Sequence, residues 1–310
     1  MPRLDEGIWR RNARSAGWQG CGCRSEPDHN STEHSQARVT PRAVRSEPVR
    51  PRREDHTPEF VGPGTPLTEQ GIAKAAASLG LGAAELWAVM SVETSGCGFL
   101  PDKRPKILFE RHLFHRLTDG QFDDTNPDIS NPSAGGYGAG GAHQYDRLAE
   151  AIGLDRDAAL QSASWGLGQI LGENFAAAGF ADAEAMVQAM TVSEDEQLMA
   201  MASFVKANGL SRALVQHDWT GFARRYNGPA FEQNDYDGKL RDFFAQFSGG
   251  DLPDLEVRTV QVLLTYKGFN PGGIDGVAGQ HTANAIRAFQ RLVGAPETGE
   301  IDAGLVAALA

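Results

Sequence analysis

The sequence predicts an all-α protein built from two globular units of unequal size. From Phe60 onward, apolar residues recur at spacings of three and four, which is typical of amphipathic helices. A stretch rich in glycine and ending in proline then separates two such patterns. The 310 residues and 41% hydrophobic content are enough for about two buried cores. We therefore expect a larger helical domain at residues 58–248, a linker at 249–253 and a small helical unit at 254–310.

Residues 1–57 differ from the rest because they lack apolar periodicity and are rich in Arg, Ser, Pro and Glu. This composition predicts a disordered basic tail. Positive charge is concentrated there, with eleven Arg and no Lys in residues 1–56, whereas the whole chain has a net charge of −11. The folded part is therefore acidic. We expect no nucleic-acid partner, because a nucleic-acid-binding domain should itself be basic.

No run in the chain has the length and hydrophobicity of a membrane span, and the N-terminus has no apolar segment of the kind found in signal peptides. We expect a soluble monomer with no stable membrane insertion, made in the cytoplasm. The three Cys and eight His are not at the spacings that zinc sites use. We therefore expect no metal and no cofactor.

Two helices are expected at the start of the larger domain. Residues 68–79 form the first, which Gly80 ends. Residues 83–94 form the next, with Leu86 and Glu93 on the same face. Glu93 therefore belongs to a stripe that should face the core.

A second glutamate repeats this pattern. The helix expected at residues 105–117 has proline in its first turn and places Ile107, Glu110 and Phe114 on one face. Burial disfavours an ionised carboxylate and raises its pKa, as a general acid near neutral pH requires. Glu93 and Glu110 are therefore candidate catalytic groups. The alternative for each is a structural ion pair with one of the nearby basic residues Arg104, Lys106, Arg111 and Arg116.

Residues 119–143 are expected to form a long irregular connection, because glycine, asparagine and proline interrupt any regular element. Such a connection could be a cleft wall or lid, or a passive surface loop. Helices are expected again at residues 144–152 and 155–161. The remaining helices of the larger domain are expected to begin at Ser193, Asp218 and Asp235.

Glycines also punctuate the segment SASWGLGQILG at residues 162–172. Gly166 and Gly168 permit close approach of the backbone to a ligand or to another helix. Gln169 is polar among apolar neighbours, and we expect it to be buried. Helix packing would explain the glycines but not the glutamine.

The most specific motifs are VETSGCGF at residues 92–99 and ILFERHLFHR at residues 107–116. The first resembles the catalytic-glutamate segment of the lysozyme-like superfamily. The second resembles the N-acetylmuramidase domain of bacteriophage endolysins. This resemblance implies a lysozyme-like helical catalytic domain with Glu93 as general acid. Glu110 is the candidate for the second catalytic group, and the weaker alternatives are Asp102, Asp123 and Asp124.

Two shorter segments resemble substrate-binding elements of lysozyme-like enzymes. The segment containing Gly168 and Gln169 is similar to a turn that lines the cleft in goose-type lysozymes and lytic transglycosylases. Tyr226 and Asn227 are similar to the start of the YNxG element. The resemblance implies that these four residues bind the N-acetyl sugar. Without it, the second segment is simply a helix C-cap.

Residues 254–310 resemble the three-helix peptidoglycan-binding module of wall hydrolases. The resemblance rests on the pattern VRxxQxxLxxxGF followed by IDGxxGxxTxxAIxxFQ. Asp275 and Gly276 should shape a turn, and Ile286 and Phe289 should lie in a small core. We expect this module to add affinity for the wall rather than chemistry.

Together the resemblances imply an endolysin-type N-acetylmuramidase with bacterial peptidoglycan as its partner. It would hydrolyse the β-1,4 bond between N-acetylmuramic acid and N-acetylglucosamine and so lyse the cell. It would be made in the host cytoplasm and reach the wall, in the periplasm, after membrane permeabilisation. One alternative is a lytic transglycosylase, which gives 1,6-anhydro products. The other is a non-catalytic peptidoglycan-binding structural protein.

Overall fold

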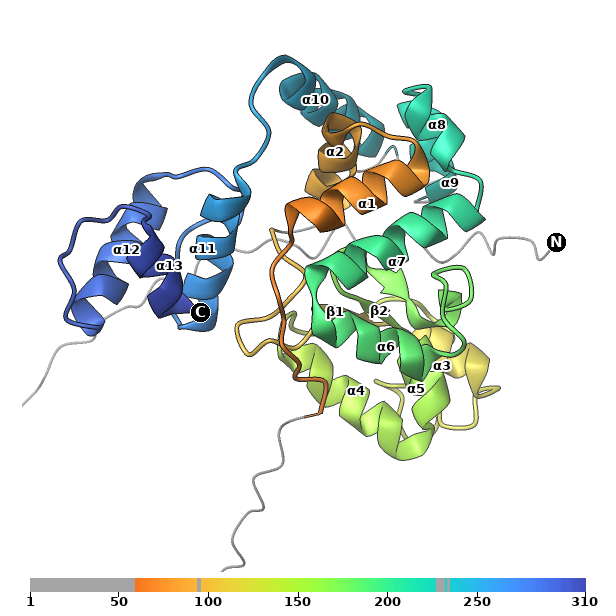
Figure 1. Cartoon of the computed structure of the whole chain (residues 1–310). Helices are drawn as coiled ribbons and strands as arrows, with labels where there is room; N and C mark the ends of the chain where they lie inside the picture. The colour runs from red at the N-terminus through yellow and green to blue at the C-terminus, as the bar shows by residue number, and fades with distance from the viewer. Residues whose placement is uncertain (1–58, 94–95, 227–231, 233–234) are drawn as a thin grey trace, which may run out of the picture.

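The computed structural model describes residues 59–93, 96–226, 232 and 235–310 (Figure 1). The predicted basic tail lies outside these residues. Helices dominate both units, which confirms the predicted fold class, and a short three-stranded sheet is inserted in the larger unit.

The larger unit begins with helices α1 and α2, passes through the sheet region and ends in a second group of helices. Its elements in chain order are α1 (Glu69–Leu79), α2 (Ala83–Glu93), β1 (Ile107–Phe109), α3 (Arg111–Leu117), α4 (His143–Leu154), α5 (Arg156–Gln161), β2 (Ala163–Trp165), β3 (Ile170–Leu171), a 3-10 helix (Gly172–Asn174), α6 (Ala183–Val192), α7 (Glu194–Ala207), α8 (Ser211–Val215), α9 (Trp219–Tyr226) and α10 (Tyr236–Gly249).

Helices α1 and α2 form where the sequence predicts them. The Thr68 hydroxyl accepts a hydrogen bond from the Gly71 N–H at the start of α1, and Gly80 closes that helix at φ 70°. The one-sided pattern expected for α2 is incomplete, because residues 86–90 are all buried. Helix α1 packs against α7 and α2, and α10 packs against α2. Helix α2 is therefore a central helix of the core, and Glu93 is its last described residue.

The helix predicted at residues 105–117 is wrong in its first half, where the chain forms strand β1. This strand pairs antiparallel with β2. Ile107 and Phe109 are buried and Leu108 between them is less so, which is the two-residue period of a strand. Pairing with a distant segment has overridden the helical spacing. Glu110 is consequently the N-cap residue of α3 rather than part of a helix face, yet it is buried, with 5% of its surface exposed.

Strands β2 and β3 form a hairpin whose turn packs against α7. Gly166 has φ 67°, and a Cβ atom there would lie 2.6 Å from the Gln197 side chain. A Cβ atom on Gly168 would lie 2.8 Å from Met201. The Gln197 Oε1 accepts a hydrogen bond from the Leu167 N–H at 2.7 Å. The glycines thus permit close approach to another helix, which was one of the two predicted reasons for them.

Gly166→Ala is expected to lower the free energy of unfolding by roughly 2–4 kcal/mol, which combines left-handed backbone strain with overpacking. Gly153→Ala is the matched control, because a Cβ atom at this α4 position meets no atom within 4 Å. It is expected to be neutral or stabilising by up to about 1 kcal/mol. Denaturant unfolding measures both changes, and equal effects would show that close packing of the turn is unimportant.

The connection between α3 and α4 has no helix or strand, as predicted, but it is anchored at several points. The buried Gln144 side chain donates to the carbonyls of Tyr137 and Ala139, each at 2.7 Å. Its Oε1 accepts a hydrogen bond from the Phe109 N–H at 3.0 Å. Arg147 also donates to the Tyr137 carbonyl. One amide side chain therefore joins the irregular connection to the sheet.

The predicted cap at Ser193 is confirmed, because its hydroxyl accepts a hydrogen bond from the Glu196 N–H at 3.1 Å. The next residue, Glu194, is fully buried although it lies in the first turn of α7. A charged residue at that position is usually explained by the helix dipole and by solvent. Its burial requires a partner from elsewhere in the chain.

The C-terminal module contains α11 (Leu255–Tyr266), α12 (Gln280–Leu292) and α13 (Ala303–Leu309), with α11 nearest the larger unit in Figure 1. Ile286 and Phe289 lie in its small core, as predicted. The turn at Asp275 and Gly276 is held by Gln261, whose Oε1 accepts both N–H groups at 3.0 Å. The predicted structural positions of the module are therefore confirmed.

Among the described residues, no single helix is long and apolar enough to cross a membrane. Helices α1 and α2 pass that test only as a pair, and they are bent by 102° relative to each other.

Candidate functional site

Glu93 lies at the end of α2, at the boundary between the core and solvent. The residue as a whole is partly buried, but its Oε1 atom is inaccessible to solvent and has no hydrogen-bond partner among the described residues. No ion pair to Glu93 occurs among those residues either. The predicted alternative, a structural ion pair with a nearby arginine or lysine, is therefore not what the described part of the chain contains.

Burial raises the pKa of Glu93 from its ordinary value of 4.5 to about 8. No neighbouring charge contributes to that shift. The carboxyl group is consequently protonated at neutral pH and can donate a proton.

Tyr226 lies near this acid, and Gly168 lies near Tyr226. Burial, and then the charge of Glu93, raises the pKa of Tyr226 well above 10. The Tyr226 hydroxyl lies 3.5 Å from the Gly168 carbonyl oxygen. The structure thus brings together three of the sequence-predicted site residues. Asn227, the fourth, lies outside the described residues.

Gln169 is half-buried rather than buried, and its amide is used within the hairpin. Its Oε1 accepts the Ser164 hydroxyl at 2.9 Å, and its Nε2 donates to the carbonyls of Lys106 and Gly166. The backbone of Gln169 also has φ 46°, which is uncommon for a residue other than glycine. Gln169 therefore holds the turn in shape beside Gly168.

Glu110 lies at the far end of β1 from that turn. Its N–H donates to the Ser162 carbonyl, whereas the Gly166 N–H donates to the Lys106 carbonyl. A strand rises ~3.3 Å per residue, so the four residue steps from Lys106 to Glu110 span roughly 13 Å. The Glu110 carboxylate accepts the Tyr137 hydroxyl at 3.2 Å, and its other oxygen lies 3.2 Å from His112 Nδ1.

Two of the weaker carboxylate candidates are held in ion pairs. Asp102 pairs with Arg104 at 2.7 Å. Asp123 accepts hydrogen bonds from Ser130 and from His115, and these lower its pKa. The pKa of Asp123 is therefore lowered, whereas that of Glu93 is raised.

Tyr137 is a residue that sequence reasoning missed. It is the single aromatic residue in the glycine-rich stretch GGYGAGG, and that isolation was the available signal. The long connection thus places one hydroxyl against a buried carboxylate.

No group of three or more His, Cys, Asp or Glu side chains that could hold a metal ion occurs in the described parts of the chain. A cleft of about 850 Å³ lies between α2, α10 and the C-terminal module. Met90 and Ser91 line it, but Glu93 does not. This cleft is therefore not where the candidate acid would meet a substrate.

A glutamic acid at the end of a core helix in a helical domain, with its pKa raised by burial and its Oε1 without a partner among the described residues, has the features of the general acid in a lysozyme-like glycosidase. Comparison with known families agrees, since residues 82–248 match N-acetylmuramidase and residues 253–309 match a peptidoglycan-binding domain. The chain belongs to the N-acetylmuramidase family. These matches confirm the predicted kind of enzyme and its predicted wall-binding module.

Among solved structures, the chain is similar to the crystal structure of the Burkholderia AP3 phage endolysin. The two are 43% identical over 59% of this chain and 71% of that one, with a TM-score of 0.56. A second similarity is to SltB3 from Pseudomonas aeruginosa in complex with NAG-NAM-pentapeptide. It has 16% identity over 78% of this chain and 80% of that one, and its TM-score of 0.27 is too low to indicate a shared fold. No curated protein matches the chain.

Proposed function

We propose that the protein is an endolysin-type hydrolase that cleaves the β-1,4 bond between N-acetylmuramic acid and N-acetylglucosamine, with Glu93 as its general acid. The observation that carries this proposal is the buried, unpaired Glu93 carboxyl with a pKa of about 8. A group with that pKa keeps its proton at neutral pH and can transfer it to the leaving oxygen. Similarity to a phage endolysin supports the biological setting.

The residues around the acid have separate roles in this proposal. Gly168 brings the backbone of the hairpin turn near the cleaved bond, and Gln169 keeps that turn in place. Tyr226 is fully buried and stacked on Phe222, with ring centroids 5.0 Å apart. It therefore orients Glu93 and the turn rather than stacking on a sugar. Asn227 would offer its amide to the N-acetyl group.

Glu110 is the proposed second catalytic group. A nucleophilic carboxylate sits about 5–5.5 Å from the acid, whereas a base that activates water sits about 6.5–9.5 Å away. Because Glu110 lies at the far end of β1 from the hairpin turn, we assign it the role that needs the longer separation, which is water activation. The Tyr137 hydroxyl would orient this carboxylate.

Glu110→Gln tests this assignment. If Glu110 activates water, kcat should fall by roughly 10²–10⁴-fold while the melting temperature stays close to that of the wild type. Tyr137→Phe is the companion variant and should reduce kcat less, because it removes only the group that orients the carboxylate. A large drop in melting temperature with kcat preserved would instead make Glu110 a structural residue.

Mass spectrometry of digested sacculi tests the proposed reaction. Hydrolysis leaves reducing N-acetylmuramic acid ends, whereas a lytic transglycosylase leaves 1,6-anhydro ends that are lighter by one water. A non-catalytic wall-binding protein would release neither. Anhydro products would reject hydrolysis while keeping Glu93 as the acid, and no products would reject catalysis altogether.

Bacterial peptidoglycan is the partner that the C-terminal domain supports. In the proposed setting the enzyme accumulates in the host cytoplasm as a monomer. It acts on the wall, in the periplasm, once the membrane has been permeabilised. Expression that lyses cells with an intact inner membrane would contradict this.

A further inference from the structure

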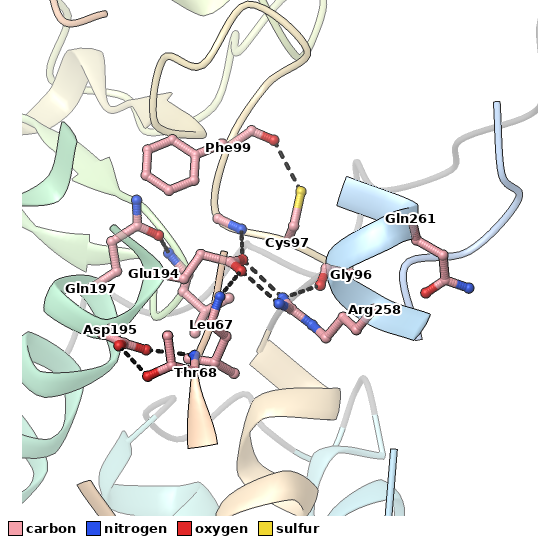
Figure 2. Close-up of polar contacts among 12 residues, drawn as sticks. Leu67, Thr68, Gly96, Cys97, Phe99, Glu194, Asp195, Gln197, Arg258 and Gln261 are labelled. Carbon is pink, nitrogen blue, oxygen red and sulfur yellow. Dashed lines mark hydrogen bonds and ion pairs between the residues drawn. The ribbon is translucent and has the colours of Figure 1, made fainter. Parts of the chain in front are cut away.

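We propose that Arg258, on the peptidoglycan-binding module, is a positioning residue for the catalytic acid Glu93. This proposal rests on the function proposed for Glu93. Arg258 lies in the first turns of α11, yet its surface is only 2% exposed because its side chain enters the larger domain. Figure 2 shows the guanidinium group reaching Glu194 and Gly96.

The Glu194–Arg258 pair is bidentate and fully enclosed. Arg258 NH1 lies 2.6 Å from one oxygen of Glu194, and NH2 lies 2.8 Å from the other. Glu194 also accepts the N–H groups of Leu67 at 2.9 Å and Gly98 at 2.8 Å. Every polar atom of this carboxylate therefore has a partner, and one of these partners comes from the other domain.

The pair holds the segment that directly follows the acid. Arg258 NH2 donates to the Gly96 carbonyl at 2.8 Å, and Glu194 accepts the Gly98 N–H. Residues 96–98 are thus fixed at both ends by the two members of one ion pair. Glu93 precedes Gly96 by only three residues along the chain.

The same segment contacts a second part of the module. Gly96 has φ 93°, and a Cβ atom there would lie 3.1 Å from the Ile274 Cβ. Tyr266 of α11 donates to the Gly64 carbonyl at 2.8 Å, and Leu255 packs against the core of the larger domain. The module is therefore docked on the catalytic domain. On this proposal the module does more than add the affinity that the sequence leads us to expect.

Burial is the cause of the raised pKa of Glu93. Docking of the module therefore affects the reaction, in this proposal, by keeping that burial in place. On this proposal, release of residues 96–98 admits water to the carboxyl group of Glu93, and its pKa falls toward the ordinary value. Lysine cannot replace Arg258 fully, since one ammonium group cannot match the planar fork that contacts both Glu194 and Gly96.

Full-length Arg258→Met and Arg258→Lys test the proposal on soluble, peptide-free glycan strands, where retention on the wall does not enter. Arg258→Met is expected to lower kcat roughly 10- to 100-fold with KM unchanged. The basic limb of its pH–rate profile should move to lower pH by about one pH unit or more.

Arg258→Lys keeps the charge beside Glu194 and should show the same two changes to a smaller extent. The matched control is Arg291→Met, which removes an arginine of the same module whose side chain is 70% exposed, and it should change neither.

If Arg258→Met does not fold, the Arg258→Lys variant alone tests the positioning role. A folded Arg258→Lys enzyme with wild-type kcat and an unshifted basic limb would overturn the positioning role. Glu93→Gln, measured in parallel, separates the two proposals. If it keeps its turnover, the function proposed for Glu93 fails; if it is inactive while Arg258→Lys is unaffected, only the further inference fails.

Discussion

Glu93→Gln is expected to lower kcat on peptidoglycan by roughly 10²–10⁴-fold, the usual cost of losing general acid catalysis. Glutamine keeps the size and hydrogen-bonding capacity of the side chain but has no proton to transfer. Binding to sacculi should be unchanged, because the wall-binding module is intact. Glu85→Gln is the control on the same helix, since Glu85 is partly buried and pairs with His217, and its kcat should match the wild type.

The same variant should alter how stability depends on pH. The folded-state pKa of Glu93, about 8, lies above its unfolded value near 4.5. The native state therefore holds a proton that the unfolded state has released, and stability falls as pH rises between these values. Glu93→Gln removes this dependence. Its melting temperature should exceed that of the wild type by more at pH 9 than at pH 5, and equal differences would show that Glu93 is not buried.

The pH–rate profile gives a third readout of the acid. Since only the protonated form donates, wild-type kcat/KM should fall above about pH 8. A basic limb far from that value would contradict Glu93 as the acid.

Glu194→Ala is expected to lower the free energy of unfolding by about 3–5 kcal/mol, the cost of breaking a buried ion pair by removing one partner. The change leaves the Arg258 charge buried without its counterion and removes the acceptor of the Leu67 and Gly98 N–H groups. Thermal and denaturant unfolding measure the loss. The control is Glu297→Ala, which breaks the exposed pair with Arg291 and should leave the unfolding midpoint in place.

Acid sensitivity provides a further check on this pair. Burial opposes ionisation of Glu194, but the charge and hydrogen bonds of Arg258, with two backbone N–H groups, lower its pKa below 4.5. Its contribution to stability is therefore present above pH 4.5 and is lost as pH falls through the folded-state pKa. The wild type should lose more stability than Glu194→Ala on going from pH 5 to pH 3. Parallel curves would mean that Glu194 is not paired as the structure shows.

Local signals in the sequence predicted most of the helices. The caps at Thr68, Gly80 and Ser193 are short-range features, and each forms as predicted. The small core of the module follows from residues spaced three apart on one helix. The prediction failed at residues 105–110, because strand pairing with β2 depends on a segment more than fifty residues away, which local periodicity does not report.

The sequence by itself placed two glutamates, Glu93 and Glu110, on faces expected to be buried. The resemblance of residues 92–99 to lysozyme-like enzymes then implied that Glu93 is the general acid. Only the tertiary structure decided how that group is tuned, because desolvation depends on what other segments place around it. Tyr226 approaches Glu93 from the end of α9, and Arg258 reaches residue 96 from another domain. In the sequence, Glu194 has the pattern of an ordinary acidic residue in the first turn of a helix. Its burial is stable only because an arginine 64 residues later supplies the opposite charge.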